Sequence, residues 1–209
     1  MRLFPQVVLT TAYFPPVEYF FAIASSRRVL LEQCEYYQKQ SYRSRCRIYS
    51  AAGPETLSVP VVKETTLSRP IRDMKVDYTD PWLQVHKRAF DAAYNSSAFY
   101  EYYKDDIFSV LDSRPKYLFD LNASLLELLL GMVGLKTEIS LTEDFVKDYG
   151  EGDLRERIHP KFRGESLLAQ YKKEKTYFQV FSDRQGFVPN LSILDLLCNE
   201  GPNAISFLL

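Results

Sequence analysis

The sequence predicts a mixed α/β fold in a single domain of 209 residues, with an N-terminal β-rich sheet region followed by a helical cluster. Short β-branched runs fill the first third of the chain, and apolar residues at helical spacing follow residue 80. No linker rich in glycine, serine or proline divides the chain. A chain of this length buries about 70% of the surface that its extended form exposes, which is enough for a sizeable core.

The first third of the chain is expected to be mostly sheet. A β-branched run indicates a buried strand over 6–13, and Pro15-Pro16 suits the first turn of a helix that runs to about residue 25. Three further strands are expected at 29–34, 42–50 and 56–62, and the last two are joined by the turn composition Ala51-Ala52-Gly53-Pro54. A short strand is also expected at 71–76.

Three amphipathic helices are expected next. Asp80-Pro81 is a favourable helix start, with Asp as the N-cap and Pro in the first turn. Asn122 is expected to cap the third helix, and Gly134 to end it. The three apolar stripes, each at a spacing of about 3.6 residues, are Trp82, His86, Ala89, Phe90, Ala93; Phe99, Tyr103, Ile107, Val110, Leu111; and Leu125, Leu126, Leu129, Leu130, Val133.

The remaining third is less regular. Residues 137–141 alternate weakly, as an edge strand does, and the charged stretch 144–175 is expected to be irregular with one helix near 165–173. A strand is expected at 177–181. A final helix is expected to start with Asn190 as its cap and to stop at Gly201-Pro202.

Charge and cysteine content limit the partners and the compartment. The 26 basic and 27 acidic side chains nearly cancel, so neither nucleic acid nor a membrane is expected as a partner, and any anion must be recognised locally. Cys34, Cys46 and Cys198 lack the spacing of a disulfide framework or a zinc site. The first 16 residues lack the apolar core of a secretory signal, and the apolar run 121–135 is shorter than the ~20 residues that a membrane crossing needs. A cytoplasmic location is the expectation.

The best candidate for anion binding is the segment YYQKQSYRSRCRIY, residues 36–49, where basic and aromatic residues interleave. Strand alternation would place Arg43, Arg45 and Arg47 on one face, about 6.6 Å apart. Guanidinium groups at that spacing suit a diphosphate or a carboxylate. The alternative is an exposed edge strand whose charges prevent pairing between sheets.

Three other residues are candidates for a site. His86 falls among apolar neighbours on its helix, so it is either a satisfied core histidine or a general base in a pocket. Asp195 faces either a pocket or the wet side of the final helix. Tyr13 lies at the end of the first expected strand and just before a helix, where open α/β sheets bind ligands. The motifs GxSxG, GxxxxGK[ST], GxGxxG and HExxH are absent, and the sequence identifies no cofactor, metal site or oligomeric state.

Several segments resemble the WbqC-like protein family, in the same order along the chain. They are YFPPVEYF at 13–20, KQSYRSRCRI at 39–48, TLSVPV at 56–61, WLQVHKRAFDAAY at 82–94 and GFVPNLSILDLLCNEGP at 186–202. The resemblance implies a bacterial cytoplasmic protein of unassigned activity, often found with genes for surface-polysaccharide or modified-sugar synthesis. Carried over to this chain, the family pattern points to Tyr13, Pro15, Lys39, Arg45, His86, Ser192, Asp195 and Asn199.

Two hypotheses of function follow. The first is a transferase that moves an acyl or aminoacyl group to a nucleotide-linked amino sugar. In it, Lys39 and the three arginines hold the phosphate, His86 is the general base and Tyr13 orients the sugar. The second is a non-catalytic module that binds an anion or a nucleotide sugar. Nucleic-acid binding through residues 36–49 ranks last, because the chain is nearly neutral.

Overall fold

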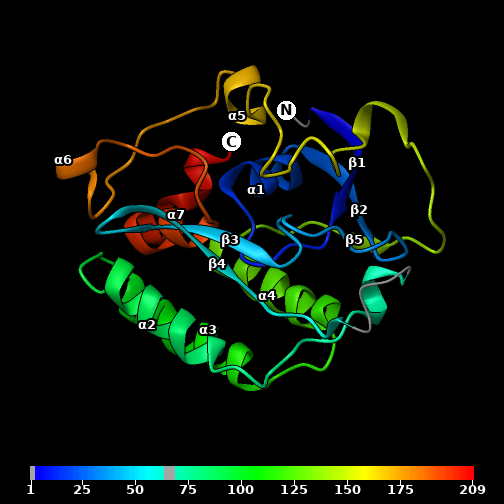
Figure 1. The fold of residues 1–209 in the computed structure, drawn as a ribbon. Helices are drawn as coiled ribbons and strands as arrows, with labels where there is room; N and C mark the ends of the chain where they lie inside the picture. Colours follow the sequence, from blue (N-terminus) through cyan, green and yellow to red (C-terminus); the bar gives the residue numbers. More distant parts are fainter. Residues whose placement is uncertain (1–2, 64–68) are drawn as a thin grey trace.

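A computed structural model describes residues 3–63 and 69–209 of the chain (Figure 1). Its larger sheet has three parallel strands in the order β1 (Phe4–Thr10), β2 (Ser26–Glu32) and β5 (Ile139–Leu141). Val8 pairs with Leu30, and Leu30 pairs with Ser140. Parallel neighbours need a crossover connection, and α1 (Val17–Ala24) supplies it between β1 and β2.

A second, two-stranded sheet is a hairpin of β3 (Arg45–Ser50) and β4 (Gly53–Ser58). Gly53, the first residue of β4 after the turn, has a φ of +112°, a backbone conformation that favours glycine. Along β3, Cys46 and Ile48 are fully buried, whereas Arg45 and Arg47 are partly exposed. The alternation expected for these four residues is therefore confirmed.

The helical cluster consists of α2 (Trp82–Tyr94), α3 (Tyr100–Asp112), α4 (Leu118–Val133) and α7 (Ile193–Glu200). α2 packs on β3 and on α3, and α4 packs on α3 and on α7. α7 also packs on α2, α3 and β3, and Figure 1 shows α2 and α3 running below the hairpin. The predicted fold class, mixed α/β with a helical cluster after a β-rich region, is confirmed.

Short elements complete the chain: η2 (Ile71–Asp73), η3 (Gly150–Gly152), α5 (Leu167–Gln170), α6 (Ser182–Gln185) and η4 (Gly201–Phe207). Within residues 3–63 and 69–209, every helix is too short or too polar to traverse a lipid bilayer.

Two expected strands are wrong. Residues 71–73 form the 3-10 helix η2, while Lys75 and Val76 make only isolated bridges. Residues 177–181 form no strand, because the side chain of Gln179 takes the place of a sheet partner. Its amide oxygen accepts from the Val188 backbone N–H at 2.8 Å, and its Nε2 donates to the Val188 carbonyl at 2.9 Å.

Three expected helix caps are also wrong. α2 has Pro81 at its N-cap position and no side-chain cap. Asn122 lies inside α4, which begins four residues earlier, and its Nδ2 donates to the Arg43 carbonyl at 2.8 Å. Asn190 caps α1 instead of α7, since its Oδ1 accepts the Glu18 backbone N–H at 3.0 Å. Ser192 caps α7. A cap is chosen by tertiary position as well as by residue type.

Candidate functional site

Three cavities meet along the segment Glu35–Gln40, which leaves the carboxyl end of β2. The carboxyl edge of an open parallel sheet is the usual place for a ligand, because loops diverge there and leave a crevice. The structure therefore places the best candidate site at this edge, and the basic-aromatic segment singled out from sequence forms its shared wall.

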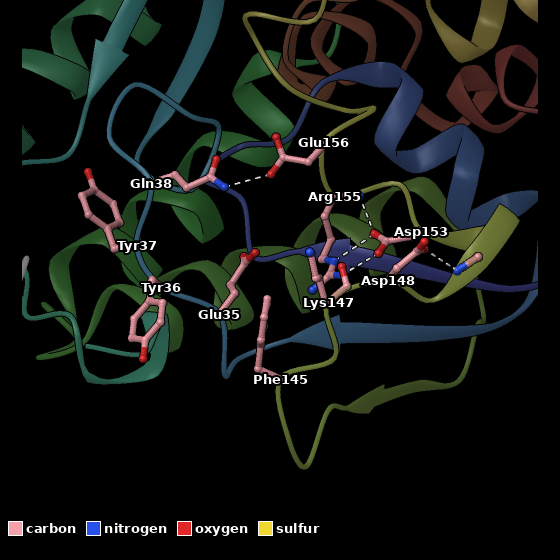
Figure 2. A pocket seen from close by; sticks show the side chains of 11 residues that line it. Glu35, Tyr36, Tyr37, Gln38, Phe145, Lys147, Asp148, Asp153, Arg155 and Glu156 are labelled. Carbon is pink, nitrogen blue, oxygen red and sulfur yellow. Dashed lines mark hydrogen bonds and ion pairs between the residues drawn. The ribbon is translucent and has the colours of Figure 1, made fainter. Parts of the chain in front are cut away.

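The first cavity, here called the aromatic cavity, has a volume of about 420 Å³. In Figure 2, Tyr36 and Tyr37 form one side, and the side chains from residues 147–155 form the other. Glu35 and Phe145 lie between them. The wall contains three aromatic rings, four carboxylates and two cations: Tyr36, Tyr37, Phe145; Glu35, Asp148, Asp153, Glu156; Lys147 and Arg155. The wall of the aromatic cavity therefore has a net negative formal charge.

Buried ion pairs hold the floor of the aromatic cavity in place. Arg43 is 1% exposed and grips Glu35 with two bonds, Nε to Oε1 at 2.8 Å and Nη2 to Oε2 at 2.6 Å. Burial raises the pKa of Glu35 above its ordinary value, and Arg43 opposes that shift. A bidentate pair fixes both side chains, so the Glu35 carboxylate is pre-oriented.

A second pair ties the far wall to the sheet. Glu32 at the end of β2 is fully buried, and its Oε2 accepts from Arg155 Nη1 at 3.1 Å. The other Glu32 oxygen accepts from the Cys34 backbone N–H at 2.7 Å and from the Thr142 hydroxyl at 2.8 Å. Arg155 also binds Asp153 through two bonds. Residues far apart in sequence are thus locked around one buried carboxylate.

The second cavity, the hairpin cavity, has a volume of about 480 Å³ and lies between the Tyr37–Gln40 segment and the β3–β4 hairpin. Among the residues that the structure describes, the wall contains three cations and no carboxylate, and these residues are Tyr37, Lys39, Gln40, Ser44, Arg45, Ser58, Val59, Val61 and Lys63. This wall is suited to an anion.

Tyr13 and His86 lie behind the wall of the hairpin cavity. The Tyr13 hydroxyl is 2.9 Å from His86 Nδ1, and the imidazole also hydrogen-bonds to the backbone of Ser58, a wall residue. Burial lowers the pKa of His86 to about 4, so the ring is neutral at physiological pH. His86 is 3% exposed and lines none of the described cavities. Its predicted role as a general base stays a prediction.

The third cavity, the basic cavity, has a volume of about 670 Å³. It shares Gln38 and Glu156 with the aromatic cavity and Lys39 with the hairpin cavity. Gln38 Nε2 donates to Glu156 Oε1 at 2.8 Å, and this bond lies at the boundary of two cavities (Figure 2). The other wall residues are His159, Lys161, Phe162 and Arg163.

The structure divides the seven site residues predicted from sequence. Lys39 and Arg45 share the hairpin cavity, with Tyr13 and His86 behind it. The expectation that Arg43, Arg45 and Arg47 point to one side is wrong. β3 begins only at Arg45, and the preceding turn directs Arg43 to the buried Glu35.

Arg47 and Asp195 lie elsewhere. The Arg47 side chain hydrogen-bonds to Tyr42 and lines none of the described cavities. Asp195 is 1% exposed, and its Oδ2 accepts from the Tyr177 hydroxyl at 2.8 Å and from Gln179 Nε2 at 2.7 Å. Burial raises the pKa of Asp195 to about 6, against the lowering effect of these two bonds. It faces the interior, not the wet side of α7.

The sequence interpretation missed the residues from 145 to 163 that line two cavities. No periodic pattern marks this charged, glycine-dotted stretch, so its return to the end of β2 is not visible in the sequence. Glu35 could have been found, because it follows a predicted strand at the edge where parallel sheets bind ligands. Within the described ranges, no group of three or more His, Cys, Asp or Glu side chains is arranged to hold a metal ion.

Comparison with known proteins agrees with the family resemblance. The uncharacterized protein Rv1507c of Mycobacterium tuberculosis is 25% identical over 225 residues, covering 96% of this chain and 96% of that protein. No solved structure matches the chain significantly. The WbqC-like protein family matches residues 11–159 and 158–207, nearly the whole sequence. This chain therefore belongs to the WbqC-like protein family.

Proposed function

We propose that this WbqC-like protein acts in surface-polysaccharide or modified-sugar biosynthesis, as a transferase that moves an acyl or aminoacyl group to a nucleotide-linked amino sugar. The observation that carries the proposal is the change of charge along one wall. Tyr37 lines both the aromatic cavity, whose wall is acidic, and the hairpin cavity, whose wall contains three cations. A nucleotide-linked amino sugar has the complementary division, with a polar, amine-bearing ring at one end and a diphosphate at the other.

The aromatic cavity suits the sugar ring. Tyr36 is 62% exposed and Phe145 is 51% exposed, so both rings are available to pack on the apolar face of a sugar. The carboxylates of the wall accept hydrogen bonds from hydroxyl groups and from an ammonium group. Because Glu35 and Asp153 are held by arginines, these acceptors are fixed before the sugar arrives.

The hairpin cavity suits the diphosphate. Lys39 and Arg45 supply charge-assisted hydrogen bonds to phosphate oxygens, and the planar guanidinium can bind two oxygens at once. Tyr13 and His86 act as positioning residues, because their hydrogen-bonded chain ends on the backbone of Ser58 in this wall. Because His86 is only 3% exposed, the proposal gives it this positioning role in place of the general-base role predicted from the sequence.

The proposed transfer joins the sugar amine to the acyl carbonyl. The ammonium group first loses one proton to water, and the neutral nitrogen then attacks the carbonyl carbon. The carbon–nitrogen bond forms while the bond between the carbonyl and the donor's leaving group breaks, and the leaving group departs with the electron pair. Glu156 lies in the walls of both the aromatic and the basic cavities, so it is placed to accept the second amine proton.

Binding of UDP-glucosamine to an Arg45→Ala variant tests the proposal. Loss of one charged hydrogen-bond donor to phosphate removes about 1.5–3 kcal/mol, so calorimetry should show a Kd at least about tenfold higher. Arg88→Ala is the matched control, because Arg88 is exposed on α2 and lines none of the described cavities. Unchanged affinity in Arg45→Ala would contradict the phosphate assignment. Tight binding with no amide product from any acyl donor would contradict the transfer and favour a binding module.

A further inference from the structure

We propose that the basic cavity is a second phosphate site, which holds the phosphorylated acyl donor while the nucleotide sugar occupies the other two cavities. The inference rests on the proposed function and extends it from one substrate to two. An acyl-transfer enzyme that holds both substrates at once must bind the donor beside the amine, and activated acyl carriers commonly contain phosphate.

The charges of the basic cavity support this ligand class. Lys39, Lys161 and Arg163 contribute three cations, and Glu156 is the one carboxylate among the described residues of the wall. Glu156 accepts a hydrogen bond from Gln38, and it belongs to none of the ion pairs found among the described residues. Lys161 and Arg163 are exposed and belong to one short stretch of chain. The local balance is cationic although the whole chain has a net charge of −1.

His159 adds a neutral donor to this cavity. Its Nδ1 accepts the backbone N–H of Lys161 at 3.1 Å, so in the neutral ring the proton is carried by Nε2. The pKa of His159 is lowered, first by burial and then by the nearby charges of Arg43 and Lys161, with Glu156 acting in the opposite direction. A neutral imidazole with one N–H is a hydrogen-bond donor suited to a phosphate oxygen.

The position of the basic cavity suits a donor. It meets the aromatic cavity at the Gln38–Glu156 hydrogen bond, so a ligand that extends across this boundary reaches the proposed sugar site. Of the described residues, Lys39 is the one that it shares with the hairpin cavity. Two anions can therefore bind to different arginines, Arg163 and Arg45, on separate segments of the chain. The lysine between them reduces their mutual repulsion.

The experiment uses two probes and two sets of variants of the full chain. Coenzyme A and acetyl phosphate represent phosphorylated acyl carriers, and UDP-glucosamine represents the sugar substrate. Calorimetry measures the Kd of each probe for the wild type, the double variant Lys161→Ala/Arg163→Ala, Arg45→Ala, and the control double variant Arg88→Ala/Lys136→Ala. Neither control residue lines the three cavities. Thermal unfolding of each variant checks that it is folded.

We expect the Lys161→Ala/Arg163→Ala variant to bind coenzyme A at least about tenfold more weakly, with the Kd for UDP-glucosamine unchanged. Arg45→Ala should show the reverse. Coenzyme A should still bind when UDP-glucosamine is saturating. Equal weakening of both probes in the Lys161→Ala/Arg163→Ala variant would overturn the inference, because it indicates one site. So would unchanged coenzyme A affinity in that variant, or binding of neither carrier to the wild type.

The two proposals can fail separately. Coenzyme A binding that depends on Lys161 and Arg163, without any UDP-glucosamine binding, refutes the proposed sugar substrate and leaves the phosphate site supported. UDP-glucosamine binding that depends on Arg45, without binding of either acyl carrier, refutes the second site and leaves the sugar site supported.

Discussion

At the scale of single residues, His86 shows how a histidine is used when the fold surrounds it. Its ring lies between Trp82 and Phe90 on α2, with ring centroids 4.9 and 6.4 Å away. Its polar atoms find partners in the Tyr13 hydroxyl and the Ser58 backbone. Of the two possibilities raised by the sequence, this arrangement is that of a core histidine with hydrogen-bond partners, since His86 is 3% exposed and lines none of the described cavities.

Substitution of His86 by Gln is expected to change how stability depends on pH. The folded state holds the pKa of His86 at about 4, below the 6.5 of an unperturbed histidine, so the unfolded chain binds this proton more readily. The stability that depends on neutral His86 is present above about pH 6.5 and is lost as the pH falls toward 4, on the order of 3 kcal/mol in all.

Urea denaturation of the wild type and of His86→Gln between pH 4 and 7 checks this expectation. The variant keeps polar atoms for Tyr13 and Ser58 but has no group that titrates. Its free energy of unfolding should be lower than that of the wild type at neutral pH, and it should fall less on acidification. Parallel profiles for the two proteins would show that His86 does not titrate as the structure indicates.

Arginine placement is the clearest residue-scale limit of the sequence interpretation. Alternation along a strand predicted that Arg45 and Arg47 share a side, and it holds because both lie in β3. The same rule failed for Arg43, which precedes the strand. Its side chain instead forms an ion pair with Glu35, which is buried and needs a counter-charge. Nothing in the sequence pairs these two residues.

At the scale of elements, close backbone approach fixes one wall of the aromatic cavity. The 3-10 helix η3 lies against β1, the Leu154 N–H donates to the Val8 carbonyl at 3.0 Å, and Asp153 bridges to Val8. A Cβ atom at Gly152 would overlap the Gln6 carbonyl oxygen. Glycine is therefore required here by the space between two backbones.

Substitution of Gly152 by Ala is expected to push η3 away from β1. Overpacking of this kind costs about 1–3 kcal/mol, to be measured by urea denaturation. Because Asp153 and Arg155 line the aromatic cavity, the Kd for UDP-glucosamine should rise as well.

The matched control for this change is Gly131→Ala in α4. A Cβ there meets nothing within 4 Å, and alanine favours a helix over glycine by about 1 kcal/mol, so this variant should be more stable than the wild type. A Gly152→Ala variant as stable as Gly131→Ala would contradict the close approach of η3 to β1.

Elements with strong periodicity were predictable, and elements defined by distant partners were not. The stripes of α2, α3 and α4 and the hairpin of β3 and β4 appear in the sequence because each follows from local pattern and turn chemistry. β5 was expected only as an edge strand at 137–141. Its parallel pairing with β2 joins residues more than a hundred positions apart, which local pattern cannot specify.

At the scale of the whole molecule, the pH profile of stability combines buried groups with opposite effects. Burial raises the pKa of Asp195 to about 6, above the 3.8 of an unperturbed aspartate, so the folded state binds this proton more readily. The stabilising effect of protonated Asp195 is fully present below about pH 3.8 and is lost as the pH rises through 6. His86 acts in the opposite sense over nearly the same range.

Substitution of Asp195 by Asn is expected to make the loss of stability on acidification that His86 causes directly measurable. The amide keeps an oxygen for Tyr177 and Gln179 but does not titrate. Relative to the wild type, the variant should lose additional unfolding free energy on the order of 3 kcal/mol as the pH falls from about 6.5 to 4. Urea denaturation across this range measures the difference. A wild-type profile as steep as that of Asp195→Asn would contradict the proposed compensation.

Only part of the candidate site could be predicted from the sequence. Lys39 and Arg45 were identified because basic and aromatic residues interleave within one short segment. Arg155, Lys161 and Arg163 were not, since they reach the site only after the chain returns to the end of β2. Local pattern identifies one wall, whereas the opposite wall depends on the tertiary fold.

The six residues of Glu35–Gln40 together border all three cavities. The ion pair with Arg43 fixes Glu35, at the start of this segment. A change in the conformation of a segment that borders three cavities changes the shape of more than one cavity. Under the proposed function, substitutions in this segment are expected to alter the affinity for both substrates together. A change in the affinity for one substrate alone is then expected from residues that line a single cavity, such as Phe145, Arg45 or Arg163.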